Sequence, residues 1–352
     1  MSGRLEVLCG TAGSGKTARL LDVFRHEQAR LLKACSPGEA VWITPTNRSR
    51  REIMRRLLDS SLRACLAPNV LTFDSFAERL LRTSGSQIAL LSPVARRMLA
   101  RTVIDEAQHA GSLPHFAPIA QTSGFLDLFL GFVSELKRDE TWPEQFETAC
   151  RQRGWFPRDA ELSLLYRHYQ DRLNELALYD AEGRFWSARL ALAEGRRGTF
   201  DRLSFVVVDG FADFTQPQYE ILENLCGHAD RVMISLPLDD LRLRTDLFAK
   251  SAAALAEINR EGRAKVTWLQ SPGLPHEGVE TSLRHIASHL FDNPRSTPQL
   301  ASAAGLEIVE AAGPAGEARA LAERIKQLLL DGATADQIVV AVRGADDDSD
   351  TL

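Results

Sequence analysis

The sequence lacks the features that mark a secreted or membrane protein. Only five of its 352 residues are cysteines, and they are scattered without a C-x-x-C pair. This spacing argues against a zinc site and against a disulfide framework. No apolar run approaches the length of a membrane span, and no charged-then-apolar export signal precedes the first predicted strand. We therefore expect a cytoplasmic protein with no membrane partner.

A large excess of charge of one sign is also missing. The chain has 42 lysines and arginines against 47 aspartates and glutamates, for a net charge of -5. Such a balance gives no overall attraction to nucleic acid, so any DNA contact must come from a local basic patch. With 44% hydrophobic and 25% charged residues, the chain is globular and long enough for more than one domain.

A glycine-rich stretch, G-T-A-G-S-G-K-T at residues 10–17, is the most informative feature present. It follows an apolar run that predicts a strand and precedes a helical pattern, which is the context of a phosphate-binding loop. Glycines let the backbone N–H groups point at phosphate oxygens, while Lys16 reaches the β- and γ-phosphates and Thr17 contacts Mg²⁺. The nucleotide-binding residues that this pattern predicts are Gly10, Gly13, Ser14, Gly15, Lys16 and Thr17.

Two further strands, at residues 40–43 and 70–73, end in polar residues, where parallel α/β sheets gather ligand contacts. An arginine-rich helix is expected at residues 49–66. Its basic face is either a solvated surface or a contact for phosphate backbone, and both interpretations stay open. After the third strand, Asp74 or Ser75 is the expected cap of the next helix.

From residue 86 to residue 198 the strand signal disappears, and apolar stripes at helical spacing indicate an all-helical insertion. We assign its aromatic residues to a core rather than to base stacking. The strand signal returns at residues 203–209, whose last residue, Asp209, either holds magnesium or caps the next turn. One more strand is predicted at residues 231–236.

Two proline-rich breaks, at residues 271–275 and 292–298, precede a last unit. Residues 306–311 and 337–343 predict strands, and a helix closed by Gly332 lies between them. A strand, a helix and a strand are too little to bury a core. We therefore expect a second α/β domain that is cut short, in a fragment of a longer protein.

Residues 10–17, 43–48, 71–76 and 208–218 occur in the order of the superfamily 1 helicase motifs. The chain resembles the amino-terminal part of that family, and most closely its AddB/RexB branch, the B subunit of bacterial helicase–nuclease complexes. The D-G-F-x-x-F-T-x-x-Q pattern at residues 209–218 is the branch-specific signal. The carboxy-terminal nuclease domain and iron-sulfur cluster of that branch have no counterpart in this sequence.

The resemblance implies a domain plan. A RecA-like P-loop NTPase domain with a parallel sheet would comprise residues 1–85 and 199–270, interrupted by an all-helical insertion at residues 86–198. A linker at residues 271–300 would lead to the start of a second α/β motor domain at residues 301–352. The fold class expected is therefore α/β.

The resemblance also implies roles for individual residues. ATP would be bound with Mg²⁺ on Thr17 and Asp209, and Gln218 would join the nucleotide site. Arg343 matches the arginine that reaches the γ-phosphate from the second domain, although an ordinary strand-end arginine is an equal alternative. The residues expected to contact DNA are Thr44, Thr46, Asn47, Arg48, Arg51, Arg55, Thr72 and Ser75.

Departures from active helicases matter as much as the matches. Active members carry D-E-x-Q-D at the second nucleotide motif, but Gly210 stands here in place of the glutamate that positions the attacking water. Losing a positioned base costs roughly 10²- to 10⁴-fold in rate. The coupling motif G-D-x-x-Q is replaced by L-P-L-D-D at residues 236–240. Pro45 replaces a phenylalanine and Asp74 a histidine.

The expected function is thus an ATP-binding, motor-like subunit with weakened hydrolysis. It would act on DNA ends in double-strand break repair and recombination, beside the A subunit of the helicase–nuclease, with nucleotide clamping the motor domains and gating the DNA path. An active helicase in which Asp213 positions the water is one alternative. A P-loop kinase is another, although residues 72–76 argue against it, and a non-enzymatic scaffold is the last.

Overall fold

The computed structural model describes residues 4–58, 62–65, 68–85, 89–239, 246–270, 279–290, 292–293, 295 and 297–342. The chain divides into two compact units, Met1–Pro272 and Gly273–Leu352. No helix in the described ranges combines the length and apolar composition needed to cross a bilayer.

Six strands form one sheet in the first unit, and every neighbouring pair is parallel. Their order across the sheet is β3 (Asn69–Thr72), β2 (Ala40–Thr44), β6 (Phe205–Val208), β7 (Arg231–Pro237), β1 (Arg4–Gly10) and β8 (Lys265–Trp268). The predicted parallel α/β sheet is therefore confirmed. Strand β8 was not predicted, because this edge strand is only partly buried and has no continuous apolar run.

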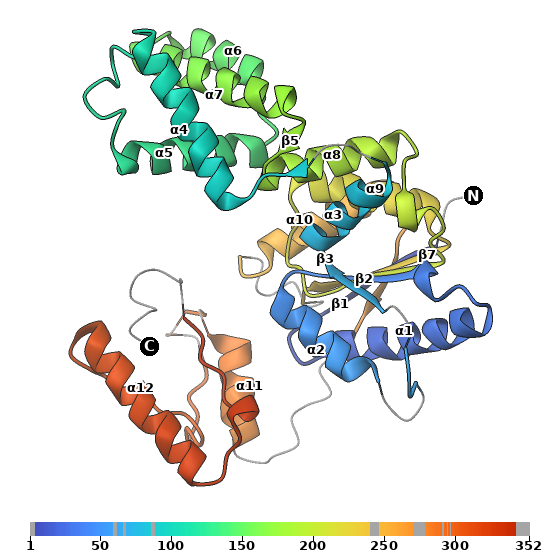
Figure 1. Ribbon diagram of the computed structural model, residues 1–352. Helices are drawn as coiled ribbons and strands as arrows, with labels where there is room; N and C mark the ends of the chain where they lie inside the picture. The colour runs from blue at the N-terminus through green and yellow to red at the C-terminus, as the bar shows by residue number, and fades with distance from the viewer. Residues whose placement is uncertain are drawn as a thin grey trace. The chain divides into compact units, whose positions relative to one another are not determined.

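Helices cover both faces of this sheet (Figure 1). One face carries α1 (Lys16–Lys33) and α2 (Asn47–Leu57). The other carries α3 (Phe73–Thr83), α8 (Ala181–Ala193), α9 (Gln216–His228) and α10 (Ala249–Ile258). Since side chains alternate along a strand, Trp42 packs under α1, with its ring 5.4 Å from that of Phe24, whereas Ile43 joins the opposite core. Burial of both faces explains the continuous apolar runs.

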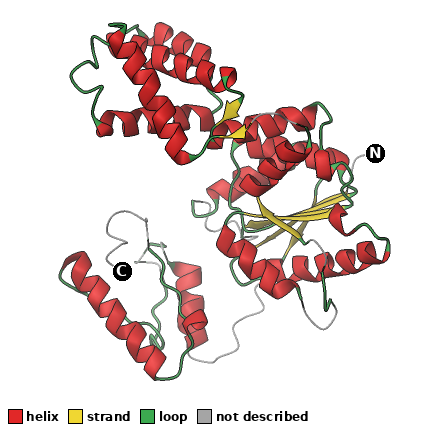
Figure 2. Ribbon diagram, in the orientation of Figure 1, coloured by secondary structure: helices red, strands yellow, loops and turns green. Residues whose placement is uncertain are grey.

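The inserted segment forms a helical body of α4 (Pro93–His109), α5 (Ser123–Arg138), α6 (Pro143–Arg153) and α7 (Pro157–Glu175) (Figure 2). Phe125, Phe129, Tyr166 and Tyr169 are buried in its core, as their helical spacing predicted. Leu128 is 71% exposed, so it lies outside the predicted apolar stripe. The body also contains two two-residue strands, β4 (Ala89–Leu90) and β5 (Leu178–Tyr179).

Helix α8 connects this helical body to the sheet. Its Ala188, Ala191 and Leu192 are buried in the core that covers the sheet, although the sequence placed this helix in the insertion. At its amino end, Asp180 accepts a hydrogen bond from the Gly183 N–H at 2.9 Å and pairs with Lys137 of α5. Core packing therefore anchors the helix on one side, and a buried ion pair anchors it on the other.

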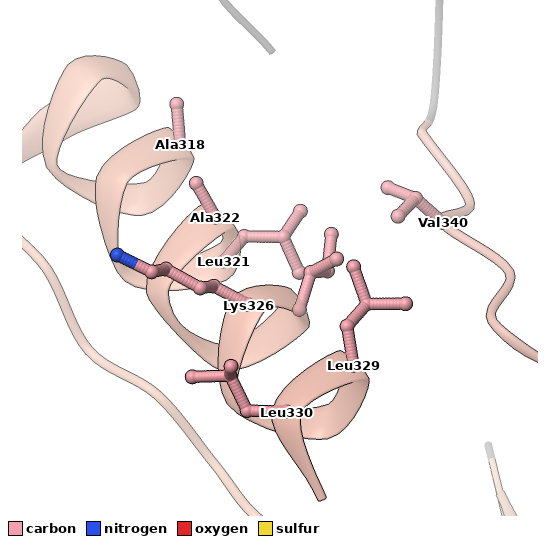
Figure 3. A pocket seen from close by; sticks show the side chains of 8 residues that line it. Ala318, Leu321, Ala322, Lys326, Leu329, Leu330 and Val340 are labelled. Atoms are coloured by element: carbon pink, nitrogen blue, oxygen red, sulfur yellow. The ribbon is translucent and has the colours of Figure 1, made fainter. Parts of the chain in front are cut away.

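The second unit contains α11 (Val279–His289), α12 (Gly313–Leu330) and a 3-10 turn, η3 (Ala335–Gln337). The helix predicted before Gly332 is confirmed as α12. Figure 3 shows its apolar face, including Leu321 and Leu329, opposite Val340.

The two strands predicted around α12 are wrong as far as the unit is described. Residues 306–311 and 338–342 have no strand structure, and Ile308 is 99% exposed. A strand needs a neighbouring strand to satisfy its backbone N–H and C=O groups. Within the described residues of this unit no such neighbour is present, so the apolar pattern alone does not produce a sheet.

Candidate nucleotide site at the carboxyl edge of the sheet

The glycine-rich stretch at residues 10–17 lies between the end of β1 and the start of α1. Gly13 and Gly15 have φ angles of +78° and +83°, a left-handed backbone that favours glycine. At Gly10, a Cβ atom would lie 2.4 Å from Ser14 Oγ and 2.7 Å from the Leu269 carbonyl oxygen. Each of the three glycines thus has a local structural reason.

Lys16 folds back over this loop. Its Nζ donates hydrogen bonds to the Gly10 carbonyl at 2.7 Å and to the Thr11 carbonyl at 2.8 Å, and it lies 3.4 Å from Ser14 Oγ. Partial burial lowers the pKa of the Lys16 ammonium, and the nearby Asp209 carboxylate opposes that shift. The loop therefore holds a cationic group against its own carbonyls at the carboxyl edge of the sheet.

Asp209 directly follows β6 and is only 5% exposed. Its Oδ2 accepts a hydrogen bond from Thr17 Oγ1 at 2.9 Å, and its Oδ1 accepts one from Ser235 Oγ at 2.5 Å. Burial raises the pKa of the Asp209 carboxyl, while these two donors and Lys16 act in the opposite direction. Two residues that are 192 positions apart in the sequence, Thr17 and Asp209, thus meet in one polar cluster.

Sequence reasoning missed Ser235. This serine lies on β7, a largely apolar strand between β6 and β1. A single hydroxyl in such a strand is the signal that could have drawn attention to it, because a buried polar group needs a hydrogen-bond partner.

The segment after Asp209 makes a tight turn followed by an aromatic cluster. Gly210 has a φ of +90°, and a Cβ atom there would lie 3.2 Å from Pro45 Cδ. Phe211 packs against Phe73 with ring centroids 5.2 Å apart, and Phe214 stacks on Phe211 at 5.1 Å. The aromatic positions of the D-G-F-x-x-F pattern therefore fasten this segment to the start of α3.

The two polar residues at the end of this segment have partners of their own. Gln218 lies in the first turn of α9, where its Oε1 accepts a hydrogen bond from the Thr215 N–H at 3.0 Å. Asp213 is more than half exposed and lies 3.4 Å from Lys250. Neither contact joins the cluster around Asp209.

Thr44 and Thr72 are buried at the carboxyl ends of the neighbouring strands β2 and β3, where they face each other in the strand register. Thr72 caps α3 by accepting a hydrogen bond from the Ser75 N–H at 3.1 Å, so the expectation that Asp74 or Ser75 caps this helix is wrong. The cap lies earlier because the helix begins directly where the strand ends. The Asp74 carboxylate is paired with Arg184 of α8.

The other residues expected to contact DNA lie on the loop after β2 and on α2. Thr46 caps α2 through the Ser49 N–H at 3.0 Å. Arg51 donates to the Asn47 carbonyl at 3.3 Å, and Arg55 pairs with Glu52 at 3.2 Å. Exposed members of this set are Thr46, Asn47, Arg48, Arg51 and Arg55. Arg343 lies outside the described residues.

These features define a class: a parallel α/β protein in which a glycine-rich loop, a buried carboxylate and a row of strand-end hydroxyls share the carboxyl edge of the sheet. Ligands of such sheets bind at that edge. The chain belongs to the family described as "ADDB, N-terminal", whose family model matches residues 7–286.

Similar proteins share one name, which describes the B subunit of an "ATP-dependent helicase/deoxyribonuclease". The protein of Staphylococcus saprophyticus is 23% identical over 91% of the chain, that of Bacillus subtilis 23% over 92%, and that of Desulforudis audaxviator 30% over 75%. These alignments cover 28%, 28% and 22% of the respective relatives. The chain therefore spans less than a third of the length of these relatives.

Proposed function

We propose that the chain is the ATP-binding, motor-like part of the B subunit of a helicase–nuclease. It would act on DNA ends in double-strand break repair and recombination, beside a partner, the A subunit, that performs most of the translocation. The observation that carries this proposal is the 2.9 Å hydrogen bond between Thr17 Oγ1 and Asp209 Oδ2. It joins the glycine-rich loop to the buried carboxylate that follows β6, which is the pairing that a P-loop NTPase uses for nucleotide and metal.

The residues present fit ATP with Mg²⁺. The loop N–H groups and the amino end of α1 favour phosphate, and Lys16 supplies a positive charge beside them. Mg²⁺ in nucleotide sites is typically held by one or two protein oxygens together with phosphates and water. Thr17 Oγ1 and Asp209 Oδ2 would be those protein oxygens. A RecA-like arrangement is supported by β7 lying between β1, which carries the loop, and β6, which carries the carboxylate.

Weakened hydrolysis follows from the residue at position 210. Gly210 has no side chain with which to orient or deprotonate water. Asp213, the residue that an active helicase would need instead, is exposed and paired with Lys250. We infer that ATP binding outlasts hydrolysis in this chain, and that nucleotide occupancy rather than turnover controls the DNA path.

The test is to measure ATP binding and single-strand-stimulated ATP hydrolysis on the same preparation. We expect binding that depends on Mg²⁺, with turnover roughly 10²- to 10⁴-fold below that of an active helicase, since a positioned base contributes that much. Turnover at ordinary helicase rates would refute the weakened motor.

Gly210→Glu is the informative variant. We expect it to remain slow and to lower the melting temperature, because a left-handed backbone costs a residue with a side chain roughly 1–2 kcal/mol and its Cβ would meet Pro45 at 3.2 Å. Gly227→Glu is the matched control, since a Cβ there meets nothing within 4 Å. A large gain in ATPase with an unchanged melting temperature in Gly210→Glu would contradict the constraint.

The exposed arginines predict a salt-dependent association with DNA. Replacing Arg48 and Arg51 with alanine is expected to reduce the slope of log K against log salt by about 0.7 for each phosphate that is no longer neutralised. Binding of single-stranded oligonucleotides of several sequences, titrated at four salt concentrations, measures this slope. Arg30→Ala, near the opposite end of α1, is the control and is expected to keep the wild-type slope. Equal slopes for both variants would assign the α2 arginines to a solvated surface.

A further inference from the structure

The hydroxyl of Ser235 lies between the two parts of the proposed nucleotide site. Strand register pairs Val208 of β6 with Ile234 of β7, so Asp209 and Ser235 come next on the two neighbouring strands. On its other side, Ser235 pairs with Leu8 of β1, two residues before the glycine-rich loop. The side chain is 1% exposed in a strand that is otherwise apolar from Val232 to Leu236.

Alternation along the strands places this hydroxyl on the face that α1 covers. Val207 and Met233 are buried in the core under α1, and two residues further along each strand come Asp209 and Ser235. Thr17, on the first turn of α1, reaches the same point. The buried stretch of β7 therefore has one polar position on this face, and it adjoins the carboxylate.

Each polar atom of this group has a separate task. Ser235 Oγ donates its single proton to Asp209 Oδ1 at 2.5 Å, which leaves Oδ2 to accept from Thr17 Oγ1 at 2.9 Å. The same Oγ accepts from the Gly210 N–H at 3.4 Å. One side chain thus fixes the rotation of the carboxylate and also supports the turn whose glycine lies against Pro45.

We propose that Ser235 is a positioning residue that holds Asp209 in the orientation required for Mg²⁺, so that the magnesium-dependent part of nucleotide affinity depends on its hydroxyl. This inference rests on the proposed function. A partner that orients a metal ligand typically accounts for roughly 10- to 100-fold in metal affinity or activity. A serine that merely filled the core would change stability without changing the response to magnesium.

The experiment measures the affinity of the chain for a fluorescent ADP analogue in MgCl₂ and in EDTA, and takes the ratio of the two dissociation constants. Ser235→Ala is expected to reduce this ratio by about tenfold or more while leaving the affinity in EDTA unchanged. Ser235→Cys keeps the side-chain volume but provides only a weak donor, so it should behave like the alanine variant. Ser235→Thr keeps the hydroxyl and is expected to retain the ratio. Ser163→Ala removes a buried hydroxyl that has no hydrogen-bond partner among the described residues, and is the control.

The outcomes separate this inference from the function on which it rests. A wild-type ratio in both Ser235→Ala and Ser235→Cys would overturn it, and so would an equal loss of affinity with and without magnesium. If Ser235→Ala does not fold, the cysteine and threonine variants decide the question. Absence of nucleotide binding by the wild-type chain would instead contradict the proposed function itself.

Discussion

Replacing Lys16 with alanine is expected to weaken ATP binding by roughly 100-fold. Hydrogen bonds to charged groups contribute about 1.5–3 kcal/mol each, and about 1.4 kcal/mol corresponds to a tenfold change in affinity. Lys16 Nζ lies over the loop, within 2.7 Å of the Gly10 carbonyl and 2.8 Å of the Thr11 carbonyl, so a phosphate bound to this loop would meet its charge directly. Equilibrium titration with a fluorescent ATP analogue measures the loss.

The control for this variant is Lys33→Ala, which removes an exposed lysine from the last turn of the same helix. It should bind ATP like the wild type. Because the Lys16 ammonium also holds two loop carbonyls, the melting temperature of both variants should be recorded without nucleotide. Unchanged ATP affinity in a folded Lys16→Ala chain would remove the basis for a nucleotide site at residues 10–17.

The glycine-rich loop was predictable from the sequence because its geometry is local. The positive φ angles of Gly13 and Gly15, and the crowding at Gly10, are properties of a few adjacent residues. Ser235 is the opposite case. Its contact with Asp209 exists only because β6 and β7 pair across the sheet after α9 has intervened, and a local pattern does not encode that pairing.

The strands show the same division. Strands buried on both faces produce continuous apolar runs, and the sequence located β2, β3, β6 and β7 by them. Edge strand β8 has no such run. Residues 306–311 have the apolar content of a strand but remain exposed, because strand formation also requires a neighbour that local composition does not supply.

The junction between the helical body and the sheet also depends on contacts that are distant in the sequence. The sequence separated the insertion from the motor-like domain at residue 198, yet α8 packs on the sheet while its cap, Asp180, pairs with α5. Arg184 and Arg189 of the same helix pair with Asp74 at the start of α3 and with Glu220 of α9. Charged residues normally predict surface, so a helix fixed by ion pairs to three other elements is difficult to place from periodicity.

The buried pair at this junction gives the largest stability effect that we expect. Lys137 and Asp180 are 1% and 0% exposed in their side chains, with Nζ and Oδ2 2.8 Å apart, and Tyr169 donates to the same oxygen at 3.1 Å. Lys137→Met is expected to lower the free energy of unfolding by about 3–5 kcal/mol, because it leaves a buried carboxylate without its counter-charge. Urea unfolding at pH 7 measures this loss. Arg172→Met breaks exposed pairs on α7 and is expected to cost far less.

The pH dependence of this variant identifies the cause. Burial alone raises the pKa of Asp180, but in the wild type the Lys137 ammonium outweighs burial and holds the pKa below its ordinary value. The paired carboxylate therefore contributes stability above the unfolded pKa, which is lost as pH falls through the folded one. Without Lys137, burial should raise the folded pKa above the unfolded value, so protonation would favour the folded state. The deficit of Lys137→Met should accordingly shrink between pH 7 and pH 5, and Lys137→Met/Asp180→Asn should recover part of it at pH 7, since asparagine still caps α8. A deficit independent of pH and unrelieved by the second substitution would mean that lost packing, rather than the uncompensated charge, destabilises the junction.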